Sequence, residues 1–171
     1  MSLLTAELQD EIRNLMARYP KPRSAILGAL HRVQEELGCL PPEAQAEVAA
    51  LFDMPPAEVD SLVTFYYMYF RKPMGRYAIK VCRSISCYLR GSDKLRCHLQ
   101  DKLGIGRGET TKDGMFSLLE GECLAACDGA PAVQINDRFV ENVTSEMLDA
   151  LLEELRKGSS RFSAWPEPCK P

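Results

Sequence analysis

Residues 77–87 read YAIKVCRSISC and carry the strongest signal for the architecture of the second half of the chain. The first five of these residues are rich in the β-branched and aromatic types that favour strands, and this β-rich run ends at Cys82. Leucines at helical spacing, at positions 95, 99 and 103, then predict a helix that begins somewhere between Cys87 and Ser92.

A second β-rich run, residues 115–119, follows this helix and ends near Cys123. A helix that joins two strands indicates a parallel pair, because a parallel connection needs a long crossover. Parallel strands finish at the same edge of a sheet, where α/β proteins usually place their functional sites. We therefore expect Cys82 and Cys123 to come together although they are far apart in the sequence.

The rest of this half predicts a hairpin and a closing helix. Residues 132–135 and 138–143 flank Asn136-Asp137, a pair typical of a two-residue hairpin turn. Thr144 can cap a final helix whose leucines form an apolar face. We write the order of elements in this half as β-α-β-β-α.

The first seventy residues read as four successive helices, with apolar positions at helical spacing and prolines at two of the expected starts. In the fourth helix, the expected apolar side consists of Val59, Leu62, Val63, Tyr66 and Tyr69. The fold class is thus α+β, with an α/β second half. We expect a small helical bundle over 1–72, a sheet domain over 73–157 and a tail with little regular structure over 158–171.

Composition excludes several classes of function. The chain has 171 residues and a net charge of -3, which argues against nucleic-acid binding because such proteins show a basic excess. No run of about eighteen apolar residues is present, so we expect no membrane insertion. The start lacks the basic and apolar regions of a signal peptide, and we expect a cytoplasmic location.

Four of the seven cysteines form two close pairs, Cys82 with Cys87 and Cys123 with Cys127. In a reducing compartment, clustered cysteines more often bind metal than form disulfides. Four thiolates suit a [2Fe-2S] cluster, with two sulfurs on each iron, but they also suit a structural zinc ion. The spacing alone leaves both possibilities open.

Positive charge near the pairs could neutralise an anionic cluster. Lys80, Arg83 and Arg90 are close enough in sequence to contribute, although solvated surface charges would look the same. The glycine-rich stretch 104–108 does not match the G-x-G-x-x-G pattern of dinucleotide sites and follows a helix, so we interpret it as a loop.

With its C-x4-C pair, long gap and C-x3-C pair, the chain resembles the 24 kDa subunit family of complex I, the thioredoxin-like [2Fe-2S] ferredoxins. Further similar stretches are VTFY at 63–66, GMF at 114–116 and DGAP at 128–131, so the resemblance runs from about residue 5 to residue 157. One position departs from the family pattern: Ala125 stands where members commonly have glycine, which would permit a positive φ.

The resemblance implies a thioredoxin-like second domain with one [2Fe-2S] cluster on Cys82, Cys87, Cys123 and Cys127. It implies an electron-transfer subunit of the NADH dehydrogenase module of a respiratory NADH:quinone oxidoreductase. Single electrons would be exchanged with the FMN of a partner flavoprotein subunit that also binds NADH, in a complex with larger iron–sulfur subunits. The chain itself would carry no catalytic residue, and the complex would place it peripherally at the inner side of a membrane.

Two alternatives stay open on the sequence. The same cysteine pattern occurs in the equivalent subunits of soluble NAD-linked or bifurcating hydrogenases and formate dehydrogenases. A zinc-stabilised interaction domain without a redox role belongs to a different class, and a colourless protein without an EPR signal would distinguish it.

Overall fold

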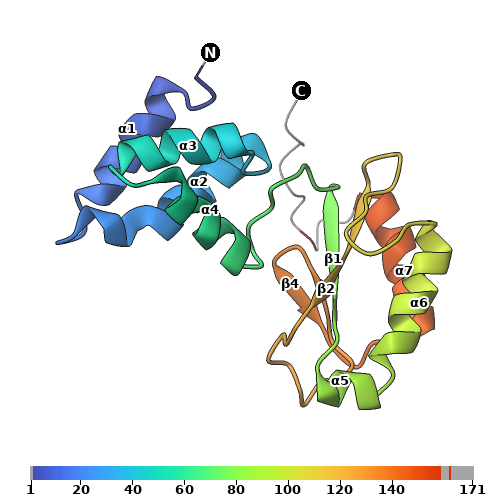
Figure 1. Cartoon of the computed structure of the whole chain (residues 1–171). Helices are drawn as coiled ribbons and strands as arrows, with labels where there is room; N and C mark the ends of the chain where they lie inside the picture. The colour runs from blue at the N-terminus through green and yellow to red at the C-terminus, as the bar shows by residue number, and fades with distance from the viewer. Residues whose placement is uncertain (1, 159–161, 163–171) are drawn as a thin grey trace. The chain divides into compact units, whose positions relative to one another are not determined.

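The structure of the protein is a computed structural model that describes residues 2–158 and residue 162. The chain divides into two compact units, and the boundary between them lies between Pro73 and Met74 (Figure 1). In the described part of the chain the first unit contains only helices, whereas the second combines a sheet with helices. No helix among the described residues is long and apolar enough to cross a membrane.

The first unit contains α1 (Ala6–Met16), a 3-10 turn η1 (Pro22–Ala25), α2 (Ile26–Leu37), α3 (Pro42–Leu51) and α4 (Pro56–Phe65). Local sequence signals explain these bounds. Thr5 caps α1, because its hydroxyl oxygen accepts a hydrogen bond from the backbone N–H of Leu8 at 3.2 Å. Both α3 and α4 begin with proline, whose fixed φ suits a first turn, and Gly38 ends α2 with a φ of 76°. The expected small helical bundle is therefore present.

The fourth helix is shorter than expected. It ends at Phe65, and Tyr66 already has an extended backbone, with φ -89° and ψ 110°. Tyr66 and Tyr69 therefore do not continue the apolar side of this helix. Tyr69 is nevertheless buried in the core of the first unit, where its hydroxyl donates a hydrogen bond to the carbonyl oxygen of Leu27 at 2.8 Å.

A buried glutamine explains why the helix stops. The side-chain amide of Gln34, in α2, donates to the carbonyl oxygen of Met68 at 3.0 Å. Its carbonyl oxygen accepts a hydrogen bond from the backbone N–H of Phe70 at 2.6 Å. Gln34 thus satisfies backbone groups that would otherwise need helical partners, and the irregular segment after α4 becomes stable.

The second unit contains β1 (Tyr77–Cys82), α5 (Ile85–Leu89), α6 (Ser92–Leu103), β2 (Phe116–Gly121), β3 (Val133–Ile135), β4 (Arg138–Val140) and α7 (Ser145–Arg156). The four strands form one sheet in the order β2-β1-β3-β4. The predicted parallel pairing of β1 with β2 is confirmed, and the other two pairings are antiparallel. In the parallel pair Cys82 lies opposite Gly121, so both strands end at the same edge.

The order of elements differs in detail from β-α-β-β-α. Each arm of the predicted hairpin forms its own strand, which adds a strand to that order. The helical connection after β1 is also divided, because Gly91 adopts a φ of 96° between α5 and α6. The predicted helix with leucines at 95, 99 and 103 is α6, which begins at Ser92, within the predicted interval. The short helix α5 before it was not predicted.

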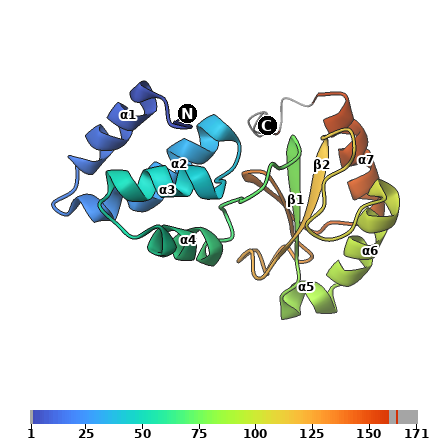
Figure 2. The same ribbon diagram turned by 45° about the horizontal axis from the view of Figure 1, so that its top comes forward.

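The core of the second unit lies between the sheet and helices α6 and α7, which run side by side along one face of the sheet (Figures 1 and 2). Tyr77 and Phe116 are the largest side chains that are fully buried there. Most of the expected tail, 158–171, lies outside the described residues. Phe162, which belongs to that range, is buried in this core with an exposed fraction of 3%.

Candidate metal centre

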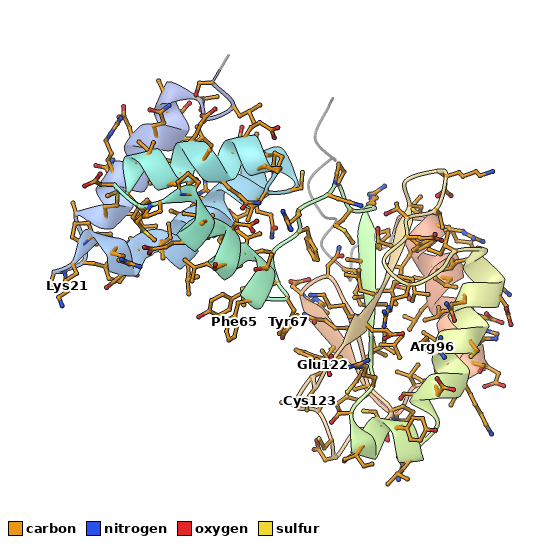
Figure 3. The ribbon with its side chains drawn as sticks, viewed as in Figure 1. Lys21, Phe65, Tyr67, Arg96, Glu122 and Cys123 are labelled. Atoms are coloured by element: carbon orange, nitrogen blue, oxygen red, sulfur yellow. The ribbon has the colours of Figure 1, made fainter. Side chains whose placement is uncertain are left out.

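The structure places the two predicted cysteine pairs at one edge of the sheet. Cys82 is the last residue of β1 and Cys87 lies in α5, and both are buried, with exposed fractions of 2% and 1%. Cys123 and Cys127 lie in the loop that follows β2 and are exposed. Figure 3 shows Cys123 beside the end of the sheet that faces α5. Because β1 and β2 end in register, the two loops emerge next to one another.

The four cysteines are close enough to interact electrostatically. Cys82 and Cys127 both add to the raised pKa of Cys87, after the larger effect of burial. Cys127 also contributes to the lowered pKa of Cys123. No group of three His, Cys, Asp or Glu side chains within the described residues is arranged around a single metal ion. The structure thus brings together all four cysteines that the sequence singled out, through pairwise contacts.

Backbone N–H groups point at two of these sulfurs. Hydrogen bonds from the Ala125 N–H and the Ser84 hydroxyl to the sulfur of Cys123 lower the pKa of this thiol. Burial raises the pKa of Cys87, although a hydrogen bond from the Ala132 N–H opposes this shift. The two thiols are therefore shifted in opposite directions, with the pKa of the exposed Cys123 lowered and that of the buried Cys87 raised.

The loop that carries Cys123 and Cys127 has an unusual backbone at Ala125. This residue has a φ of 57°, in the left-handed region that favours glycine. Position 125 is also the one at which the sequence departs from the family that the chain resembles, whose members commonly have glycine there. The conformation directs the Ala125 N–H to Cys123, and alanine adopts it at a cost in free energy.

The apolar support of the loop comes from Leu124. Its side chain is buried, with an exposed fraction of 6%, in a small cluster with Cys82, Cys87, Ala130 and Ala132. This cluster lies beneath the candidate centre and is separate from the main core of the unit. One leucine thus ties the exposed cysteine loop to the buried pair.

The three cations that the sequence suggested lie in different surroundings. Lys80 is buried within β1, and burial lowers its pKa to about 8. Arg83 pairs with two acidic side chains, Glu120 and Glu122, and Arg90 is exposed. The sequence did not predict Ala125 and Ala132 as hydrogen-bond donors. Every residue type except proline has a backbone N–H, so the residue type does not indicate this role.

The donor set fits a [2Fe-2S] cluster. Thiolates are soft ligands that suit iron–sulfur clusters, and two pairs of cysteines on separate loops provide two sulfurs for each iron. The N–H groups of Ala125 and Ala132 supply the hydrogen bonds that an anionic cluster needs. The exposed pair would leave one side of the cluster near solvent or a partner protein.

Known proteins with similar sequences and structures place this arrangement in a family. The sequence model of the thioredoxin-like [2Fe-2S] ferredoxin family matches residues 12–156. One of the NADH-quinone oxidoreductase subunits of Rhizobium meliloti is 44% identical over 149 residues, which cover 87% of this chain and 89% of the relative. NADH-quinone oxidoreductase subunit 2 of Thermus thermophilus is 44% identical over 153 residues, covering 88% and 84%.

A solved structure is similar as well. One chain of an NAD+-reducing [NiFe]-hydrogenase in the H2-reduced state superposes with a TM-score of 0.68 and 29% sequence identity, over 78% of this chain and 22% of the hydrogenase chain. The family match itself runs from within α1 to the last residue of α7 and includes all four cysteines. The chain therefore belongs to the thioredoxin-like [2Fe-2S] ferredoxin family.

Proposed function

We propose that this protein is an electron-transfer subunit that holds one [2Fe-2S] cluster on Cys82, Cys87, Cys123 and Cys127. One observation carries the proposal: two cysteine pairs that are distant in the sequence meet where the parallel strands β1 and β2 end. Membership of an iron–sulfur family favours iron over the zinc ion that the spacing alone would also allow. The names of the similar proteins favour the NADH dehydrogenase module of an NADH:quinone oxidoreductase.

In this proposal the buried cysteines would anchor the cluster, and the exposed cysteines would leave one side of it accessible. When bound, the cluster supplies a centre that accepts and returns one electron at a time. The buried Cys82 and Cys87 anchor it to the sheet edge, and the N–H groups of Ala125 and Ala132 stabilise negative charge on the sulfurs. Cys123 and Cys127 are exposed and would hold the side of the cluster that a partner protein can approach.

A partner must supply the two-electron chemistry. NADH gives up a hydride, and a flavin converts this two-electron event into single-electron steps. We infer that an FMN- and NADH-binding flavoprotein subunit is the partner, together with larger iron–sulfur subunits, and that the complex lies peripherally at the cytoplasmic side of a membrane. The chain by itself does not oxidise NADH in this proposal. NADH oxidation by the purified chain without an added flavoprotein would contradict it.

A second candidate function is the equivalent subunit of a soluble NAD-linked enzyme. The similarity to part of an NAD+-reducing [NiFe]-hydrogenase chain favours it. The two functions differ in the proteins that surround the chain. Purification of the native complex decides between them, since an NADH:quinone oxidoreductase brings membrane subunits with it and a soluble hydrogenase brings a nickel–iron subunit.

The ligand set is tested by substitution. The purified chain is expected to contain about two iron atoms and to give an EPR signal when reduced with dithionite. Cys123→Ser should lose iron or change the EPR signal, because it removes one of the four thiolates. Cys97→Ser is the matched control, since Cys97 is exposed on α6 and outside the centre. Iron content and EPR signal equal to wild type in Cys123→Ser would refute the ligand assignment.

A further inference from the structure

Three arginines from separate segments converge on one glutamate beside the candidate centre. Arg107 Nη1 lies 2.9 Å from Glu120 Oε2. Arg96 Nε lies 3.7 Å from Glu120 Oε1, and Arg83 Nη1 lies 3.8 Å from Glu120 Oε2. Arg83 follows Cys82 directly, Arg96 belongs to α6, and Arg107 lies between α6 and β2. We call these four residues the Glu120 cluster.

The Glu120 cluster is close to the cysteines. Glu120 is the residue of β2 opposite Val81, one position before the pair Cys82 and Gly121. A cavity of about 490 Å³ has Cys82 in its wall together with all four members of the cluster. The side chain of Glu120 is only 15% exposed, which limits the screening of its charge by solvent.

We propose that the Glu120 cluster sets the reduction potential of the iron–sulfur centre, with the Glu120 carboxylate offsetting part of the positive charge of the three guanidinium groups. This inference rests on the proposed function. Reduction adds one electron and thus one negative charge to the centre, so positive charge nearby favours the reduced form and negative charge favours the oxidised form. Arginine stays protonated at every accessible pH, which makes this a fixed source of positive charge.

Two arginines of the Glu120 cluster have further acidic partners, which should keep them in place when Glu120 is replaced by glutamine. Arg83 also pairs with Glu122 at 2.7 Å, and Arg96 with Asp93 at 2.7 Å. A glutamine at position 120 would still accept hydrogen bonds from the guanidinium groups. The Glu120→Gln variant therefore removes a charge while the arginines retain partners.

The experiment is a redox titration of the cluster-loaded chain, followed by EPR, with dithionite as the reductant. Glu120→Gln should shift the potential upward, and Arg107→Gln should shift it downward. We expect each to change the ratio of reduced to oxidised cluster at a fixed ambient potential on the order of tenfold, about 59 mV for a one-electron couple. Glu153→Gln, an equal change of charge at an exposed position on α7, is the control and should leave the potential unchanged.

The double variant separates electrostatics from loosened structure. Glu120→Gln combined with Arg107→Gln should return the potential to near the wild-type value, because the two charge changes cancel. A structural disturbance would instead accumulate in the double variant. If the Glu120→Gln variant does not bind a cluster, the Arg107→Gln variant is the test. A reduction potential of Arg107→Gln equal to that of the wild type overturns the inference.

Failure of this inference is distinguishable from failure of the proposed function. A wild-type chain without iron or an EPR signal would contradict the proposed function. A wild-type chain with a normal cluster, whose potential is the same in Glu120→Gln and Arg107→Gln, would contradict only the role of the Glu120 cluster.

Discussion

The two cysteine pairs lie at the same edge of the sheet but are held there by different kinds of structure. Cys82 and Cys87 are held by regular hydrogen bonds in β1 and α5 and are buried. Cys123 and Cys127 lie exposed in an irregular loop whose position depends on single residues, among them Leu124 and Ala125. Regular secondary structure therefore positions the first pair of the candidate centre, whereas the position of the second pair depends on individual loop residues.

The largest expected difference between the pairs is chemical reactivity in the cluster-free protein. Hydrogen bonds lower the pKa of Cys123, which is exposed, whereas burial raises the pKa of Cys87 and shields it. A lower pKa maintains the reactive thiolate at a pH at which an ordinary thiol is protonated. Cys123 should react with iodoacetamide near neutral pH faster than Cys87 by about tenfold or more.

Peptide mass spectrometry over a time course measures both rates in the same sample. The rates should converge in the denatured protein, where the local environments are lost. Equal rates in the folded protein would mean that the two pairs are not held differently.

The next effect in size concerns the residue that ties the loop to the buried pair. Leu124→Ala should lower the free energy of unfolding by about 2–4 kcal/mol, because it leaves a cavity beneath the centre. Urea unfolding measures this loss, and iron content after loading reports whether the loop still holds its cysteines. Leu89→Ala is the control, because Leu89 is 76% exposed on α5 and should change stability by less than about 0.5 kcal/mol. Equal effects of the two substitutions would remove Leu124 from this role.

The smallest predicted effect tests the strained backbone of the loop. Ala125→Gly should raise the free energy of unfolding by about 0.5–1 kcal/mol, since relief of the left-handed strain exceeds the extra chain entropy of glycine. The neighbouring Ala126→Gly should lower it by a similar amount, because Ala126 has no positive φ to relieve. Thermal unfolding of both variants checks the opposite signs, and a destabilised Ala125→Gly would contradict the argument.

Sequence reasoning succeeded where a structural rule has a local signal. The helix between two β-rich runs predicted their parallel pairing, and that pairing brings Cys82 and the loop after Gly121 to one edge. The predicted cap at Thr144 is present at the start of α7, where its hydroxyl oxygen accepts a hydrogen bond from the Met147 N–H. The unusual alanine at position 125 was noticeable only against the pattern of a family.

It failed where the decisive partner is distant in the sequence. The end of α4 is set by Gln34, which lies in another helix and bonds to the backbone after Phe65. The Glu120 cluster draws its arginines from three segments, so no window of the sequence contains it. Both features are hydrogen-bonded or ionic contacts between remote residues, which periodicity does not encode.

The in-register ends of β1 and β2 have a consequence for stability. Because the proposed ligands lie on either side of this edge, a bound cluster would cross-link the chain and close a loop that contains α6 and the whole of β2. Closing a long loop removes conformational entropy from the unfolded chain, so metal loading should protect the second unit against heat while leaving the helical bundle nearly unaffected. Loss of the cofactor would then disable the redox centre and, at the same time, loosen the scaffold that must receive a new one.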